Sequence, residues 1–358
     1  MQMDNEVSHV KRRMLTSLTG LRFLGALWVY LFHFGSTFAI GHPSLHVVGV
    51  FLSHGYLGVS LFFVMSGFVL IYTYEGRETR KGWIAEFFVA RFARLYPVYL
   101  LALLIAAPFL PLASSPGQLT ATLLLVQSWG LPSSGLGYFW ISQGWALSVE
   151  FTFYLVFPML LGPISRLSPK SLWWCIGICS LIMFVFAAPT IGPLTTSYPF
   201  EFLGYVPLPV LRMFEFAQGL LLGRLFLQLR GRFEGRTLGL ATGIVCLAIL
   251  ILTATTNNAH LLTATVILMS VLIVLLAFGN NALTHLLSQP ALQLLGESAY
   301  ALYILQGPVR MVVGQFGDKI LVAVVNPLVA FPLAVIVYLV IEKKCRVGIL
   351  SLARRSRR

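Results

Sequence analysis

The chain has 358 residues, of which 58% are hydrophobic and only 10% charged, and its mean hydropathy is +0.84. Soluble domains carry about 25% charged residues, so this composition excludes an ordinary soluble protein and indicates one integral membrane domain. The net charge of +13 could suit nucleic acid, but the basic residues cluster at the ends of apolar segments rather than among aromatic side chains. We therefore expect membrane lipids as surroundings and no nucleic-acid binding.

The apolar segments predict the fold class. A helical span needs about 20 mostly apolar residues, and by this measure we expect an all-α, polytopic membrane helix bundle of about ten transmembrane helices. They are expected at 22–40, 56–74, 92–112, 140–162, 172–189, 205–227, 237–254, 261–278, 293–314 and 320–341. The shorter apolar stretch 117–131 predicts an interfacial or re-entrant piece. Residues 1–358 thus form a single domain, with a cytoplasmic tail at 1–17, a basic cytoplasmic tail at 343–358 and no cleaved signal peptide.

The distribution of basic residues predicts the orientation of these spans. If both termini are cytoplasmic, 22 of the 25 lysines and arginines fall in segments on the cytoplasmic side. The three that fall outside are Arg212, Arg310 and Lys319. Such a bias is what the positive-inside rule requires, and counting 117–131 as an eleventh span would destroy it.

The first span carries two polar residues, Arg22 and His33. Eleven residues at 100° each bring them within about 20° of the same helix face, and about 16 Å apart along the axis. This spacing predicts Arg22 at the cytoplasmic interface and His33 near the membrane midplane, where an ionisable group is usually functional. A topology anchor for Arg22 and a packing role for His33 are the plainer alternatives.

The next polar groups follow in and after the second span. Ser66 and Gly67 lie in its middle, where they either serve function or allow a close helix contact. The loop after this span ends in "RFARLYP", which places Arg91 and Arg94 one turn apart on the same membrane side as Arg22. Three arginines at one mouth could clamp the phosphates of a nucleotide-bearing donor, or could simply anchor the helices.

Three carboxylates, Glu150, Glu215 and Glu297, lie inside later spans. Glu150 lies in the fourth, beside Trp145 and Tyr154, where insertion scales put the cost of a charge at roughly 2.5–3.5 kcal/mol. Such a group needs a partner; His33 is the natural candidate for a catalytic or a purely structural pair. Glu215 lies in the sixth span, before a GxxxG packing face, and either binds substrate or is structural.

No metal site is expected, because the clustered histidines and cysteines have no further ligand residues of a suitable type near them in the sequence. His42, His46 and His54 crowd the first outer connection without carboxylate or cysteine support. Cys175 and Cys179 share a helix face, but no histidine or acidic residue accompanies them, so they are interpreted as packing residues.

Taken together, these residues resemble the acyltransferase-3 family of bacterial membrane O-acyltransferases. The family's Arg/Lys, ten residues, His pattern is matched by Arg22 and His33, its serine–glycine pair by Ser66 and Gly67, and its arginine-x-x-arginine loop by Arg91 and Arg94. Its "WSLxxExxFY" pattern is similar to Trp145 through Tyr154. The chain departs from the family at Gln306, where a histidine is frequent, and after Glu342, where a proline is lost.

The resemblance implies an enzyme that moves an acyl group, most simply acetyl, from acyl-CoA to a hydroxyl. It implies that Arg22, Arg91 and Arg94 bind the donor phosphates and that His33 is the general base or a transient acyl carrier. Glu150 would orient the imidazole, Ser66 would hydrogen-bond near the thioester, and Trp145, Tyr154 and Glu215 would bind the acceptor. The expected acceptor is a glycan or lipid-linked saccharide, such as a lipopolysaccharide or exopolysaccharide sugar, at the bacterial inner membrane.

Other functions remain open at this point. A macrolide-type small molecule is an alternative acceptor, and a homo-oligomer is not excluded. A transporter or flippase with an intramembrane His/Glu relay would also explain polar residues at depth. Against it, the spans show no matching pair of Gly/Pro-broken helices in the two halves of the chain. Thioester-dependent CoA release by the purified protein would separate the enzyme from the transporter.

The charge bias makes the topology testable. We expect a cysteine placed at residue 356 and the loop 77–94 to face the cytoplasm, and positions 42–54 and 114–137 to face outward. Labelling with a membrane-impermeant thiol reagent in intact cells checks this. Labelling of residue 356 from outside the cell would overturn the topology.

Overall fold

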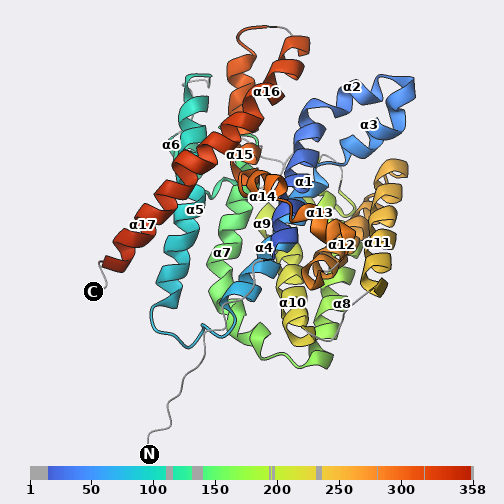
Figure 1. Ribbon diagram of the computed structural model, residues 1–358, viewed down its shortest axis with the longest axis vertical. Coiled ribbons are helices and arrows are strands. Elements are labelled where there is room, and N and C mark those ends of the chain that lie inside the picture. The colour runs from blue at the N-terminus through green and yellow to red at the C-terminus, as the bar shows by residue number, and fades with distance from the viewer. Residues whose placement is uncertain are drawn as a thin grey trace, which may run out of the picture.

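The computed structural model describes residues 15–109, 116–130, 140–192, 195, 198–230, 236–279, 281–317 and 319–355, and these contain helices but no strand (Figure 1). The first half holds α1 (Thr16–Phe34), α2 (Ser36–Ile40), η1 (Pro43–Leu45), α3 (His46–Ser53), α4 (Leu57–Tyr74), α5 (Trp83–Ala106), η2 (Ala107–Phe109), α6 (Pro116–Leu123), η3 (Gln127–Trp129), α7 (Gly144–Ser165) and α8 (Pro169–Phe186). The second half holds η6 (Ala188–Thr190), η7 (Glu201–Tyr205), α9 (Leu208–Leu211), α10 (Met213–Leu229), α11 (Arg236–Thr255), α12 (Ala259–Phe278), α13 (Ala282–Leu287), α14 (Pro290–Glu297), α15 (Ala299–Val313), α16 (Lys319–Val337), η8 (Tyr338–Glu342) and α17 (Lys343–Arg355).

Each of the predicted spans overlaps a helix, and the prediction of a multi-pass helical membrane protein is confirmed. Seven stretches in the described residues are long and apolar enough to cross a membrane: Pro43–Tyr74, Trp83–Phe109, Gly144–Ser165, Pro169–Phe186, Thr237–Thr255, Ala259–Phe278 and Val322–Ala353. The other predicted spans are α1, which carries Arg22 and His33, and the shorter α10 and α15, of 17 and 15 residues. The count of ten spans and the orientation of the termini therefore stay predictions.

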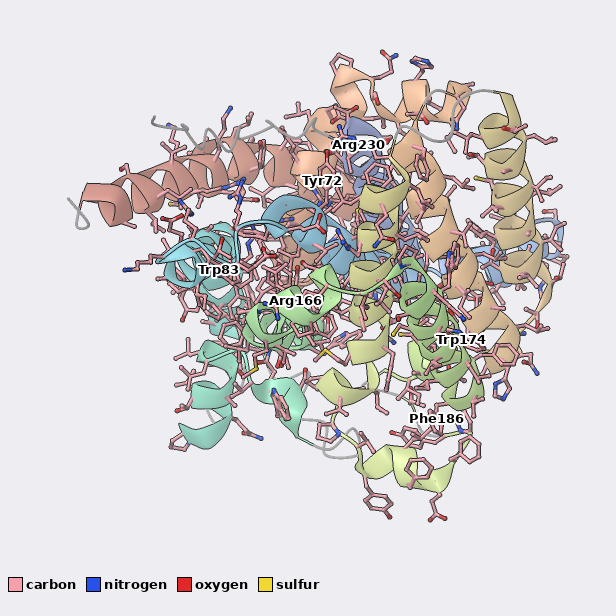
Figure 2. All side chains as sticks on the ribbon, turned by 90° about the horizontal axis from the view of Figure 1, so that it is seen from below. Tyr72, Trp83, Arg166, Trp174, Phe186 and Arg230 are labelled. Carbon is pink, nitrogen blue, oxygen red and sulfur yellow. The ribbon has the colours of Figure 1, made fainter. Side chains whose placement is uncertain are left out.

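The connections that were expected on the cytoplasmic side share one end of the bundle. The α4–α5 and α7–α8 connections both lie at the lower end in Figure 1. Figure 2 views the molecule from this end, and its labelled residues Trp83, Arg166 and Arg230 lie where α5 begins and where α7 and α10 end. The stretch 117–131 forms only the short α6 and η3, as expected of a segment that does not span. Residues 1–14 of the expected tail at 1–17, residues 356–358, and positions 114–115 and 131–137 of the expected outer loop lie outside the described residues.

Helix α1 begins earlier than the apolar pattern predicts. The Thr16 hydroxyl shares a 2.8 Å hydrogen bond with Ser288, and the Ser17 hydroxyl donates to the Leu276 carbonyl at 2.9 Å. Neighbouring helices therefore satisfy these polar side chains inside the bundle, and the helix ends at Phe34 instead of near residue 40. As a consequence His33 lies in the last turn of α1, not in its middle as predicted.

Helices α4 and α10 pack against each other at backbone contact. A Cβ added to Gly67 would lie 2.2 Å from the Phe216 carbonyl oxygen, and one added to Gly219 would lie 1.9 Å from that of Val64. Gly223 continues the contact one turn on, where a Cβ would meet Ile71 at 2.3 Å. Gly67 thus has a packing role, whereas its neighbour Ser66 lines the cavity described below.

The C-terminal residues correct one expectation. Residues 343–358 were predicted to be a basic tail, but Lys343–Arg355 form helix α17, which continues from α16 through η8, a π-helical turn, and packs beside α5 (Figure 1). The pattern was misleading because lysines and arginines dominate this segment, while apolar residues such as Leu350 still follow a helical period. The segment is part of the bundle.

The α4–α10 contact yields a stability prediction. Gly219→Leu is expected to lower the free energy of unfolding by about 1–3 kcal/mol or more, because its side chain has no room between the two backbones. Gly243→Leu is the matched control: Gly243 is also within a helix, α11, and a Cβ there meets nothing within 4 Å. Thermal unfolding in detergent measures both variants, and equal melting temperatures would contradict the close packing.

Candidate active site

A cavity of about 350 Å³ opens among α1, α4, α5, α7, α14, α15, η8 and α17. Along α4 it extends from Val59 to Thr73, which corresponds to about 21 Å at 1.5 Å per residue. Thr73 is near the end of α4 that leads into the α4–α5 connection, so the cavity runs from that end of the bundle well into the membrane-spanning region. Its length and position suit an elongated ligand that enters from one side of the membrane.

The lining of the cavity is highly charged for a membrane interior. It contains four arginines, Arg22, Arg91, Arg94 and Arg346, and three carboxylates, Glu150, Glu297 and Glu342. The Arg91 guanidinium lies over the rings of Phe87 and Tyr154, 5.8 Å from each centroid, and its buried Nε has no hydrogen-bond partner. Arg94 lies within electrostatic range of Glu150 and Glu342. With all groups ionised the lining carries one net positive charge, which suits an anionic ligand.

Glu150 is held by residues of its own helix and of α4. The Tyr154 hydroxyl donates a hydrogen bond to Glu150 Oε1, and the Ser66 hydroxyl donates a second one to the same oxygen at 3.4 Å. Tyr154 is one turn after Glu150 on α7, so helical spacing alone brings the two together. Three residues predicted from sequence, Ser66, Glu150 and Tyr154, are thus brought together beside Arg22 and Arg91.

His33 lies apart from this group. It is three turns beyond Arg22 on the same face of α1, about 16 Å along the axis, and its side chain is exposed rather than in the cavity lining. Val29, one turn before His33, contacts the backbone at Gly58, next to Val59 at the inner end of the cavity. His33 therefore lies about one helical turn past that end, and the expected Glu150–His33 pair is replaced by the contacts of Glu150 with Tyr154 and Ser66.

The surroundings of His33 are aromatic and cationic. Its ring lies 4.9 Å from that of Phe32, and it is within electrostatic range of Arg310 on α15. The Arg310 guanidinium in turn lies 5.7 Å from the centre of the Phe34 ring. Aromatic rings and one arginine therefore border the imidazole.

Trp145 and Glu215, predicted to bind the acceptor, lie behind the cavity wall. Glu215 forms a fully buried ion pair with Arg212, 2.6 Å between Oε2 and Nε. The Arg212 guanidinium also donates to the carbonyls of Pro189 and Ile191 and to the Ser60 hydroxyl, at 2.7, 3.1 and 2.8 Å. Trp145 covers that guanidinium at 5.7 Å. This cluster joins α4, α10 and the 189–191 segment, so the geometry favours the structural alternative for Glu215.

Several cavity residues were not assigned a role from the sequence. Arg346 was counted only as a cytoplasmic charge, Glu297 only as an acidic residue within a span, and Glu342 only as a position shared with relatives. The Tyr338 hydroxyl, one turn before Glu342, donates to Glu297 Oε2 at 2.6 Å and so joins η8 to α14. Their i, i+4 spacing (338, 342, 346) was the available signal, since it places three polar groups on one helix face.

Gln306, at the position of a histidine frequent in relatives, is buried and outside the cavity lining. Its side-chain amide donates to the Tyr303 carbonyl at 2.9 Å, and Tyr303 itself lines the cavity. Among the described residues, no group of three or more histidine, cysteine or acidic side chains is arranged to hold a metal ion. The charged groups that could hold a cofactor are the arginines, whose guanidinium groups suit phosphate.

Comparison with known proteins places this geometry in a family. The acyltransferase-3 family, described as an acyltransferase domain, matches residues 15–342. The acyltransferase MdmB of Streptomyces mycarofaciens is 34% identical over 227 residues, which are 58% of this chain and 56% of that protein. The O-acetyltransferase OatA of Staphylococcus aureus is 27% identical over 186 residues, 48% of this chain and 28% of OatA.

The matches thus span about half of MdmB and less than a third of OatA. A putative O-acetyltransferase of Staphylococcus aureus is 24% identical over 200 residues, 49% of this chain and 31% of that protein. No solved structure shows a significant similarity to the chain. The family match covers every residue of the cavity group except Arg346, and the chain belongs to the acyltransferase-3 family of membrane acyltransferases.

Proposed function

We propose that this protein is a membrane O-acyltransferase that moves an acyl group, most simply acetyl, from acyl-CoA to a hydroxyl of a glycan. The observation that carries the proposal is the cavity lined by four arginines together with Glu150 and Ser66, within a chain of this family. The acceptor class is a sugar of a lipopolysaccharide or exopolysaccharide at the bacterial inner membrane, with a macrolide-type alcohol as the alternative.

The donor binds with its phosphates at the arginines. Arg91, Arg94 and Arg346 are on α5 and α17, and Arg22 reaches the same cavity from α1. Guanidinium groups form charge-assisted, frequently bidentate hydrogen bonds to phosphate, and in a site of low dielectric these contacts are strong. With the phosphates held there, the pantetheine arm follows α4 along the cavity toward Val59, and the thioester comes to the end nearest His33.

Transfer requires a base for the acceptor hydroxyl. The His33 imidazole accepts the hydroxyl proton while the oxygen attacks the thioester carbonyl carbon, the carbon–sulfur bond breaks, and the proton passes to the CoA thiolate, which leaves as the thiol. A transient acyl-His33 is the two-step variant of this chemistry. Its position past the inner end of the cavity allows His33 to meet an acceptor that arrives from the opposite side of the membrane to the donor.

Glu150 has a different part from the one expected. Because it contacts Ser66 and Tyr154 instead of His33, it offsets the positive charge of Arg22 and Arg94 and keeps the Tyr154 hydroxyl fixed in the cavity wall. Both effects preserve an open cavity in which the arginines remain available to the donor.

The arginines give the first functional test. Arg91→Ala, Arg94→Ala and Arg346→Ala are each expected to raise the Kd for acetyl-CoA about tenfold or more, because a hydrogen bond to a charged group contributes about 1.5–3 kcal/mol. Lysine should restore binding only partly, since it acts as a point charge. Arg230→Ala is the control, an arginine at the same end of the bundle that does not line the cavity. Calorimetry measures the binding. Wild-type Kd values in all three variants would show that these arginines do not bind the donor and only anchor the helices at the membrane surface.

His33 gives the second test. His33→Ala and His33→Gln are each expected to lower the transfer rate by about 10²–10⁴, the usual cost of losing a positioned base, with acetyl-CoA binding unchanged. Glutamine keeps the size and one hydrogen bond but cannot take a proton at neutral pH. His46→Gln, in the α3 segment, is the control. The rate of CoA release in the presence of acceptor measures the effect. A near wild-type transfer rate in His33→Gln would contradict the role of His33 as the general base.

A further inference from the structure

Glu342 is a buried carboxylate that the proposed chemistry does not use. It ends η8, a π-helical turn at Tyr338–Glu342, and π-helical turns inside longer helices are rare and frequent at functional sites. The residue is 5% exposed and lines the cavity, and its Oε2 has no hydrogen-bond partner in the described structure. Buried carboxylate oxygens are almost always hydrogen-bonded, so a free one that lines a cavity points to a ligand.

The groups around Glu342 define what that ligand must offer. Three arginines, Arg94, Arg346 and Arg22, lie within electrostatic range of Glu342, and their charges oppose that of its carboxylate. Glu297 is also within range, but it carries the same charge as Glu342. Glu297 differs in another respect, because the Tyr338 hydroxyl already donates to it at 2.6 Å. Glu342 therefore combines balanced charge with an unused acceptor atom.

Phosphate and carboxylate oxygens both accept hydrogen bonds, so neither can satisfy the other. A ligand that suits the arginines and Glu342 together must carry phosphate groups and, beside them, an O–H or N–H donor. A nucleotide does so through its ribose hydroxyls and the amino group of its base, and acidic side chains bind ribose hydroxyls in other nucleotide sites. Phosphopantetheine alone offers one hydroxyl and two amide N–H groups along its arm, whereas the nucleoside offers its donors beside the nucleotide phosphates, so removal of the nucleoside from the donor separates the two sources.

We propose that Glu342 Oε2 accepts a hydrogen bond from the nucleoside of the donor, at a ribose hydroxyl or the adenine amino group. The residue then makes the site selective for nucleotide-bearing thioesters over donors that carry phosphopantetheine alone, including acyl carrier proteins. This inference rests on the proposed function, because it assigns a part of the same donor site.

Donor truncation tests the proposal. Wild type, Glu342→Gln and Glu342→Met are compared with acetyl-CoA and with acetyl-4′-phosphopantetheine, which keeps the thioester and one phosphate but lacks the nucleoside. Glu342→Met should raise the KM for acetyl-CoA about tenfold or more with kcat unchanged, and should leave the KM for the truncated donor as in wild type. Glu342→Gln keeps an acceptor oxygen, so its KM for acetyl-CoA should lie between those of wild type and Glu342→Met.

Two other measurements complete the design. Glu297→Gln is the matched control, a second cavity carboxylate that already has a partner, and it should not change the ratio of the two KM values. Binding of 3′,5′-ADP and of inorganic pyrophosphate, measured without turnover, should show that Glu342→Met weakens only the nucleotide.

Several outcomes would overturn the proposal. An equal loss for both donors in Glu342→Met would mean that Glu342 only positions the arginines, and no loss for either would mean that it binds nothing. A change of the KM ratio in Glu297→Gln as large as in Glu342→Met would indicate a general charge effect. If wild type releases CoA from neither donor, the proposed function itself fails, which is a distinct result.

Discussion

The constraint on which this structure depends is that a charge inside a membrane must be compensated, since an isolated one costs several kcal/mol. The protein meets it in two ways. Arg212 and Glu215 form a closed cluster, in which backbone carbonyls and Ser60 accept hydrogen bonds from the guanidinium and neither charged residue lines the cavity described above. Arg22, Arg91, Arg94 and Arg346 form an open cluster with three carboxylates, in which donor and acceptor atoms remain unused.

The closed cluster supports the open one. Phe63, on α4, lines the cavity, and the Arg212 guanidinium lies 5.3 Å from the centre of its ring. The buried ion pair therefore supports this wall of the cavity from the side away from the cavity. The glycine contacts between α4 and α10 hold the same wall at backbone distance. A rigid wall matters because catalytic groups act only when held in the productive geometry. Stability and site geometry thus share residues on α4.

In the proposed function, the arrangement of the charged residues and His33 separates donor binding from acceptor access. The arginines and Glu342 gather toward the end of the bundle where α4 meets α5, whereas His33 ends α1 on the other side of the cavity. A long thioester donor can bridge this distance, and a water-soluble or lipid-linked acceptor need not enter the charged region. The charged lining of the cavity and the aromatic residues around His33, beyond its inner end, agree with such a division.

The sequence by itself determined the membrane class, the helical segments and four of the seven charged residues of the cavity. Composition and the positions of Arg22, Ser66, Arg91, Arg94, Glu150 and Tyr154 sufficed, because helical periodicity and the cost of buried charge act locally along the chain. Only the tertiary structure decided which polar groups meet. It placed His33 in the last turn of α1, because that helix ends at Phe34 and α2 begins after Gly35. It paired Glu215 with Arg212, and it placed in the cavity both Arg346, from the predicted tail, and Glu342, directly after the last predicted span. The Arg212–Glu215 pair has i, i+3 spacing, which the sequence already contains. The meeting of α1, α5 and α17 at the cavity instead depends on contacts between residues far apart in sequence, which no local pattern encodes.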